Sequence, residues 1–178
     1  MIPSPFRFER ALTSDSLSKL ALLSLRWALI DHVLTNCLKI LRGLTDEEAI
    51  DEVFPQYASR KIDEIKRLMR SRTLCPEGDE AYQALMKVIS GVRVVRDAGP
   101  HGTIMSLNAD VTFDHRSKRR KFTLQEVLEM EELTNYAAHA ALILRHELGD
   151  KDPEGRPGPL PQRPAIPTHL KAFIQNSL

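Results

Sequence analysis

The sequence has 178 residues, of which 42% are hydrophobic and 28% are charged, and its formal net charge is +1. A chain of this length builds one hydrophobic core, and its balanced charge excludes nucleic-acid binding by the surface as a whole, so any such binding needs a local basic patch. No apolar run approaches the roughly 20 residues of a membrane span. Cys37 and Cys75 lack the short spacings of a disulfide framework or a zinc site. We therefore expect a soluble cytoplasmic protein.

Residues 1–12 predict an extended N-terminal arm, because Pro3 and Pro5 exclude a regular helix there and interrupt the apolar region that a signal peptide needs. A long helix follows, opened by cap residues at 13–15 and ended near Gly43. Between Leu20 and Leu34 this helix is apolar over most of its circumference. Such a helix is central in a bundle or covered by a second protomer. We favour the second protomer and so predict a homodimer.

Two shorter helices are expected next. Residues 45–48 form a capping box that opens a helix ending by Pro55. The following helix opens at Ser59 and turns an apolar face inward. Its outer face is basic, and a face of this kind is typically solvated. The basic residues of this face are Arg60, Lys61, Lys66, Arg67, Arg70 and Arg72.

The stretch from Ala81 to Thr103 predicts a helix that follows a loop at residues 73–78 and stops at Gly99-Pro100. Its apolar residues recur at steps of three and four, which gives one buried face. Arg93 and Arg96 lie three apart, so both guanidinium groups leave the same side of the helix. An arginine, a carboxylate and an imidazole then meet within six residues, at Arg96, Asp97 and His101. This cluster is the candidate site.

After the central helix, the apolar period changes from helical to alternating. Residues 107–113 alternate as in a strand, residues 114–117 predict a turn, and residues 118–122 form the partner strand. We therefore predict an all-α, up-and-down helical bundle with a small β-hairpin insertion near residues 103–122. The hairpin carries a dense basic run that would track a phosphate backbone, with a merely solvated turn as the alternative. The run consists of Arg116, Lys118, Arg119, Arg120 and Lys121.

A second capping box at residues 123–126 starts the last long helix, which Gly149 stops. The helical domain thus spans residues 13–150. Residues 151–167 are rich in proline and predict an exposed linker that does not pack. Residues 168–178 form a short docking segment, with Leu170, Phe173 and Ile174 on one face. This segment docks on its own domain or on a protein partner.

The run Arg96-Asp97-Ala98-Gly99-Pro100-His101-Gly102 resembles the signature of the HEPN superfamily: arginine, a polar residue, three variable residues and histidine, commonly followed by glycine. The context is also similar, with a mid-helix Trp27 in a long first helix and a later helix that ends on the motif. The resemblance implies a HEPN-like bundle that often dimerises with the two motifs facing each other. In active members of the family it implies metal-independent cleavage of RNA.

The resemblance also implies residue roles. His101 would be the proton shuttle for attack by a ribose 2′-hydroxyl, Arg96 the phosphate clamp, and Asp97, where the family most often has asparagine, the residue that orients one of them. Arg93 would add a second cation. The alternatives are an ordinary ion pair at the helix end, a non-catalytic module that binds RNA or a nucleotide, and a helical interaction protein such as a toxin–antitoxin component. We expect no metal or cofactor, since phosphate-cradling glycine loops and HExxH motifs are absent from the sequence.

Overall fold

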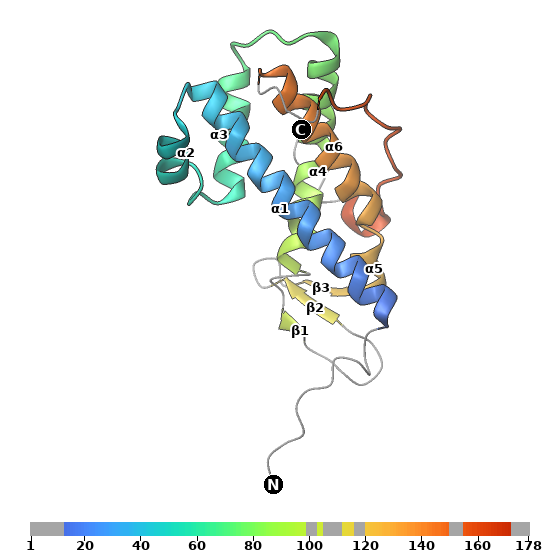
Figure 1. Cartoon of the computed structure of the whole chain (residues 1–178). Coiled ribbons are helices and arrows are strands. Elements are labelled where there is room, and N and C mark those ends of the chain that lie inside the picture. The colour runs from blue at the N-terminus through green and yellow to red at the C-terminus, as the bar shows by residue number, and fades with distance from the viewer. Residues whose placement is uncertain (1–12, 99–102, 105–111, 116–119, 150–154, 172–178) are drawn as a thin grey trace.

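The fold is a bundle of α-helices with a small antiparallel sheet at one end (Figure 1). The computed structural model describes residues 13–98, 103–104, 112–115, 120–149 and 155–171. Helix α6 (Glu131–Glu147) packs chiefly against α1 (Ser14–Arg42) and α4 (Pro76–Ala98). These three helices share one continuous core, so the prediction of an all-α bundle with a hairpin insertion is confirmed. No helix in the described part of the chain is both long and apolar enough to cross a membrane.

Helix α1 begins and ends at the residues that the sequence predicts. The Thr13 hydroxyl accepts a hydrogen bond from the Ser16 backbone N–H at 3.1 Å. Gly43 closes the helix in the left-handed conformation with φ 68°, which glycine adopts without steric cost. The buried face includes Trp27, which is 6% exposed, and Ile30, which is fully buried. Because its opposite face stays exposed, α1 lies along the outside of the bundle and not at its centre.

Helix α2 (Asp46–Glu52) opens with the predicted capping box, in which Thr45 and Glu48 each bond the backbone N–H of the other. Helix α3 (Ala58–Met69) begins one residue before the predicted Ser59, with Tyr57 at its N-cap position and no side-chain cap. The prediction of a solvated basic face on α3 is wrong at Lys61, which is fully buried. The backbone of α3 turns this side chain toward α1 and not toward water.

Helix α4 begins five residues before the predicted Ala81, so the expected loop at 73–78 is shorter than predicted. Cys75 caps this helix: its Sγ accepts a hydrogen bond from the Gly78 N–H at 3.3 Å, and Pro76 occupies the first helical position. The helix buries Leu85 completely and runs without a break to Ala98. Its end therefore matches the predicted end.

The sheet contains β1 (Thr103–Ile104), β2 (Thr112–His115) and β3 (Arg120–Thr123), in that order and antiparallel. β2 and β3 form the predicted hairpin, with Thr112 opposite Thr123. β1 adds a third strand that the sequence analysis did not assign. Asp114 and His115 lie in β2, so the predicted turn at 114–117 starts too early; residues 116–119 and 105–111 lie outside the described residues.

The predicted last long helix is two helices, which corrects the sequence analysis. The capping box of Thr123 and Glu126 opens α5 (Leu124–Leu128), and the chain turns at Glu129 and Met130 before α6 begins. Met130 is fully buried at this turn. No proline or glycine marks the position, so the break carries no local sequence signal.

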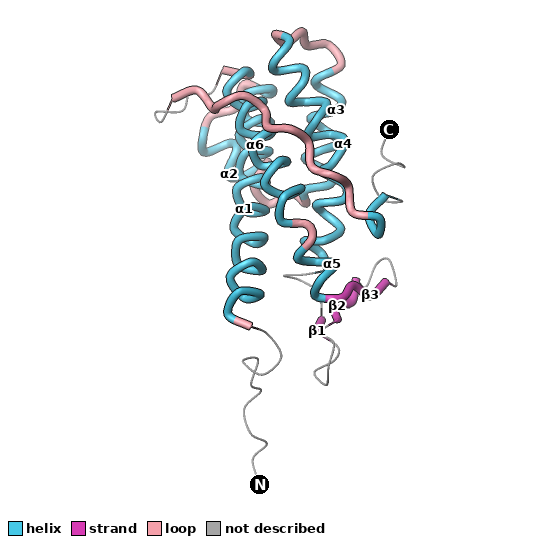
Figure 2. The backbone as a smooth tube through the Cα atoms, turned by 90° about the vertical axis from the view of Figure 1, so that its right-hand side faces the viewer, coloured by secondary structure: helices cyan, strands magenta, loops and turns pink. Residues whose placement is uncertain are grey.

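Most of the described residues of the predicted linker are exposed, as expected, but the prediction that the linker does not pack is wrong. Residues 155–170, which we call the C-terminal strap, run along the bundle and end in a 3₁₀ helix at Thr168–Leu170 (Figure 2). Leu160 and Ile166 pack against the core and Leu170 is fully buried in it. The strap therefore belongs to the bundle. Phe173 and Ile174, predicted to dock beside Leu170, lie outside the described residues.

Candidate functional site

The predicted motif lies at the end of α4. Arg96 and Asp97 are in the last turn of this helix, which ends at Ala98. His101 and Gly102 lie outside the described residues, and so do the side chains of Arg96 and Asp97. The structure thus places the first two motif residues, Arg96 and Asp97, at the end of a helix. The undescribed residues 99–102, which include His101, follow directly after Ala98 in the sequence. The candidate helix-end ion pair falls on the same undescribed side chains.

The basic hairpin run is only partly described. Arg116, Lys118 and Arg119 lie outside the described residues, whereas Arg120 and Lys121 are in β3. In the register of the sheet, Arg120 is opposite His115 and Lys121 is opposite Asp114. These two cations are therefore held on a paired strand and not on a free turn.

Arg93 lies one helical turn before Arg96 and lines a cavity of about 140 Å³ between α3 and α4. Lys66 lines the same cavity from α3, and both side chains are half-buried. Arg93 is a predicted site residue, whereas Lys66 was expected on a solvated face. The two residues are 27 positions apart in the chain, so only the packing of the two helices brings them together. The remaining lining residues are Ser59, Ile62, Asp63, Met86, Ile89 and Ser90.

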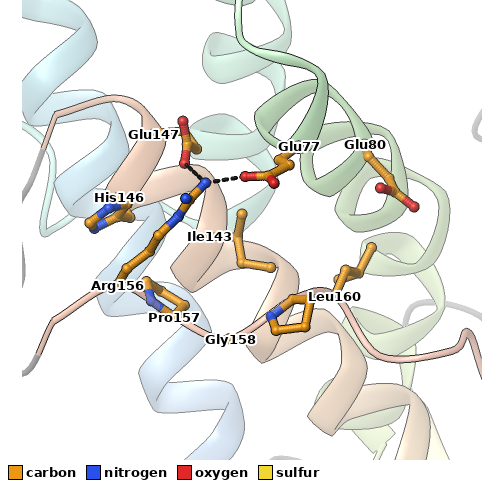
Figure 3. Close-up of a pocket in the computed structure, with 10 residues that line it drawn as sticks. Glu77, Glu80, Ile143, His146, Glu147, Arg156, Pro157, Gly158 and Leu160 are labelled. Atoms are coloured by element: carbon orange, nitrogen blue, oxygen red, sulfur yellow. Dashed lines mark hydrogen bonds and ion pairs between the residues drawn. The ribbon is translucent and has the colours of Figure 1, made fainter.

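A second and larger cavity, of about 360 Å³, lies under the C-terminal strap (Figure 3). The first turn of α4, the last turns of α6 and the strap form its walls. Ile143 and Leu160 supply apolar surface, while Glu80 adds a carboxylate on the α4 side. A volume of this size is at the lower end of the range for pockets that hold small organic ligands.

One network of charged groups lines this second cavity. The Arg156 guanidinium lies between the carboxylates of Glu77 and Glu147 and bonds to both, at 3.2 Å from the Glu147 Oε1 (Figure 3). The Cys75 Sγ donates to the Glu147 Oε2 at 2.9 Å. The pKa of Glu147 lies below its usual value. The main cause is the hydrogen bond from Cys75, and the positive charge and hydrogen bond of Arg156 lower this pKa further. The network therefore fastens the strap to α4 and α6.

The same residues contain the ligand types of a metal site. The ligand atoms of Cys75, Glu77 and Glu147 all lie within 4.8 Å of one another. However, the guanidinium of Arg156 already binds both carboxylates and supplies the positive charge that a metal ion would bring. The arrangement is thus a structural latch made by the chain itself. The latch has no signal in the sequence, because Cys75 and Glu147 are 72 residues apart and form no motif.

Searches of protein-family models, of curated proteins and of solved structures find no match to this chain.

Proposed function

We propose that this chain is a HEPN-like, RNA-directed protein that cleaves RNA without a metal ion. The observation that carries the proposal is the course of α4, which continues unbroken through Arg96 and Asp97 and ends at Ala98. In the sequence His101 follows Ala98 by three residues, so the arginine and the histidine belong to one short segment of the chain, which starts in the last turn of α4. The long α1 with its buried Trp27 fits the same family resemblance.

The residue types at the α4 end suit cleavage by a 2′-hydroxyl. The attacking hydroxyl must lose a proton to a group with a near-neutral pKa, which is the ordinary range of an imidazole. Charge then develops on the non-bridging phosphate oxygens, which a guanidinium stabilises with two parallel hydrogen bonds. His101 is assigned the proton transfer, Arg96 the phosphate, and Asp97 the orientation of one of them. Arg93 and the hairpin cations Arg116, Lys118, Arg119, Arg120 and Lys121 bind the RNA backbone.

A homodimer completes this proposal, because two copies of the motif supply one histidine as base and another as acid. The support comes from α1, where Leu22, Leu25 and Leu29 are 41%, 67% and 38% exposed. These three residues, which we call the leucine face, recur at steps of three and four and so lie on one side of the helix. An apolar helix face of this kind is a typical protein interface. We place the protein in the cytoplasm, where RNA is available.

The test is cleavage of single-stranded RNA by purified protein in the presence of a metal chelator. We expect the wild-type protein to cleave, and His101→Ala and Arg96→Ala to lose at least 100-fold in rate, as removal of a general base or of an oxyanion donor does. His32→Ala is the control, because His32 is an exposed histidine on α1 that bonds to Asn36 of its own helix. Full activity of His101→Ala, or a requirement for magnesium, would contradict the proposal.

The leucine face also favours a second candidate function, a helical interaction protein without nucleic-acid affinity, such as one component of a toxin–antitoxin pair. This candidate predicts no RNA binding at low salt and a protein partner that requires Leu25. A non-catalytic RNA- or nucleotide-binding module is intermediate between the two. It predicts binding that survives His101→Ala but is lost when Arg119 and Arg120 are neutralised.

A further inference from the structure

The cavity between α3 and α4 brings two cations, Lys66 and Arg93, to one wall of the bundle. Within the described part of the chain, neither Lys66 nor Arg93 makes a hydrogen bond or an ion pair, although Asp63 lines the same cavity. Their neighbours differ: Arg42 bonds Glu52 and lies 3.9 Å from Glu64, and Arg67 lies 3.8 Å from Glu64. Arg67, the neighbour of Lys66 on α3, thus has a carboxylate close by, whereas Lys66 and Arg93 have no ion-pair partner among the described residues.

The chemistry of the cavity wall favours an anion with several oxygen acceptors. With Lys66 and Arg93 positive and Asp63 negative, the formal charge of the lining is +1. Arg93 offers a planar fork that binds two oxygens of one phosphate, and Lys66 offers a compact point charge. Ile62, Met86 and Ile89, which are nearly or fully buried, add apolar surface beside the cations, and a charge interaction next to apolar surface is stronger than one in bulk water.

The size of the cavity limits what it holds. Pockets that enclose a drug-sized ligand have volumes of about 300–1,000 Å³. At about 140 Å³ this cavity is too small for a nucleoside but has room for one phosphate group whose substituents stay outside. A phosphodiester fits that description, because its sugar and base continue on both sides. Arg93 also lies one turn before Arg96, about 4.5 Å along the helix axis.

We propose that Lys66 and Arg93 form a phosphodiester subsite, which holds one RNA phosphate adjacent to the phosphate at the end of α4. The inference rests on the part of the proposed function that makes RNA the ligand. It does not require that the protein cleaves the RNA. It adds α3 to the RNA-binding surface, and it assigns Lys66 a role that Arg67, its neighbour on the same helix, does not have.

The test is binding of the full-length wild-type protein to a fluorescent single-stranded 2′-O-methyl oligoribonucleotide, which lacks the attacking hydroxyl and stays intact. Lys66→Gln and the matched control Arg67→Gln remove the same charge from adjacent positions of α3. We expect Lys66→Gln to weaken binding about tenfold, the effect of one charge-assisted hydrogen bond. The slope of log K against log salt should also fall by about 0.7, since one phosphate contact is lost. Arg67→Gln should change neither quantity.

A second arm separates RNA from a free phosphate as the ligand. Inorganic phosphate at millimolar concentration should not displace the oligonucleotide from wild-type protein, because one phosphate makes only a fraction of the contacts of a strand. Displacement by inorganic phosphate would show that the subsite serves a free anion, and equal effects of Lys66→Gln and Arg67→Gln would show that only net charge matters; either result overturns the proposal.

If wild-type protein does not bind the oligonucleotide at low salt, the subsite and the proposed function are both refuted. Selective weakening by Lys66→Gln in a protein that does not cleave RNA would uphold the subsite and refute only the nuclease activity. Thermal unfolding of both variants checks that the fold is intact.

Discussion

Lys61 of α3 and Asp31 of α1 form an ion pair whose positive end is completely buried and whose negative end reaches water. The Lys61 Nζ lies 3.0 Å from the Asp31 Oδ2, and the two side chains are 0% and 30% exposed. The ammonium also donates to the Thr35 Oγ1 at 3.0 Å and lies 5.7 Å from the centre of the Phe54 ring. A charge without water needs such partners, because its desolvation costs several kcal/mol. This pair therefore fixes α3 against α1.

The unequal burial of the pair predicts unequal effects of mutation. Asp31→Ala leaves a buried ammonium with only Thr35 as a polar partner, and we expect it to lower the free energy of unfolding by about 3–5 kcal/mol. Lys61→Met removes the buried charge itself, keeps the volume of the side chain and leaves Asp31 partly hydrated. The free energy of unfolding of Lys61→Met should therefore fall by less than about 2 kcal/mol. Urea denaturation of the two variants measures the difference. Equal losses, or a larger loss for Lys61→Met, would show that the burial of Lys61 has no energetic consequence.

The strap should contribute to stability mainly through Leu170. This side chain is fully buried, so Leu170→Ala should lower the free energy of unfolding by about 2–5 kcal/mol. Ile50→Ala serves as the control, because Ile50 is 62% exposed, and it should change the free energy of unfolding by less than about 0.5 kcal/mol. Protease cleavage within residues 155–167 should accelerate in Leu170→Ala alone. Similar behaviour of the two variants would mean that the strap does not pack on the core.

The latch at Arg156 predicts a specific dependence on acid. Because hydrogen bonds to Cys75 and Arg156 lower the pKa of Glu147 in the folded protein, its carboxylate stabilises the fold above the unfolded pKa, about 4.3. That contribution is lost as the pH falls through the lower pKa of the folded state. The unfolding free energy of the wild type should therefore fall more steeply below pH 5 than that of Glu147→Gln. Glu132→Gln, at an exposed position of α6, should retain the wild-type slope, and a shared slope for all three proteins would exclude the latch as an acid-sensitive contact.

The leucine face predicts the effect of a charge on self-association. Leu25 is 67% exposed, so Leu25→Glu should leave the melting temperature of the monomer unchanged while converting a dimer to a monomer. Ile50→Glu introduces the same charge at an exposed apolar position of α2, and the mass of its particle in solution should remain that of the wild-type dimer. Light scattering coupled to gel filtration distinguishes the two. A monomeric wild-type protein would remove the dimer from the proposed mechanism.

Local sequence signals predicted the start of three helices, α1, α2 and α5. The capping boxes at Thr45 and Thr123 and the N-cap at Thr13 each depend on residues within one turn, and the structure contains all three. The hairpin of β2 and β3 was also predicted, from apolar alternation. In each case neighbouring residues determine the backbone, so no tertiary contact was needed to identify the element.

Features that depend on distant residues were not predictable in this way. The burial of Lys61 depends on Asp31, which is 30 residues away, and the attachment of the strap depends on Glu77 and Glu147. The pairing of Lys66 with Arg93 in one cavity likewise follows from the packing of α3 on α4. For the motif itself, the sequence predicted the helix end that carries Arg96 and Asp97, while the convergence with His101 stays a prediction.

The most direct measurement compares two single-stranded RNA substrates in the presence of a metal chelator. One is all-ribose, and the other has a single 2′-deoxy nucleotide at the mapped cleavage position. If His101 activates the 2′-hydroxyl, the wild-type protein cleaves the first substrate to leave a 2′,3′-cyclic phosphate and does not cut the second at the substituted position. The His101→Ala variant then cuts neither substrate at that position. Cleavage of the deoxy-substituted position at an equal rate, or cleavage that His101→Ala leaves intact, would contradict the account.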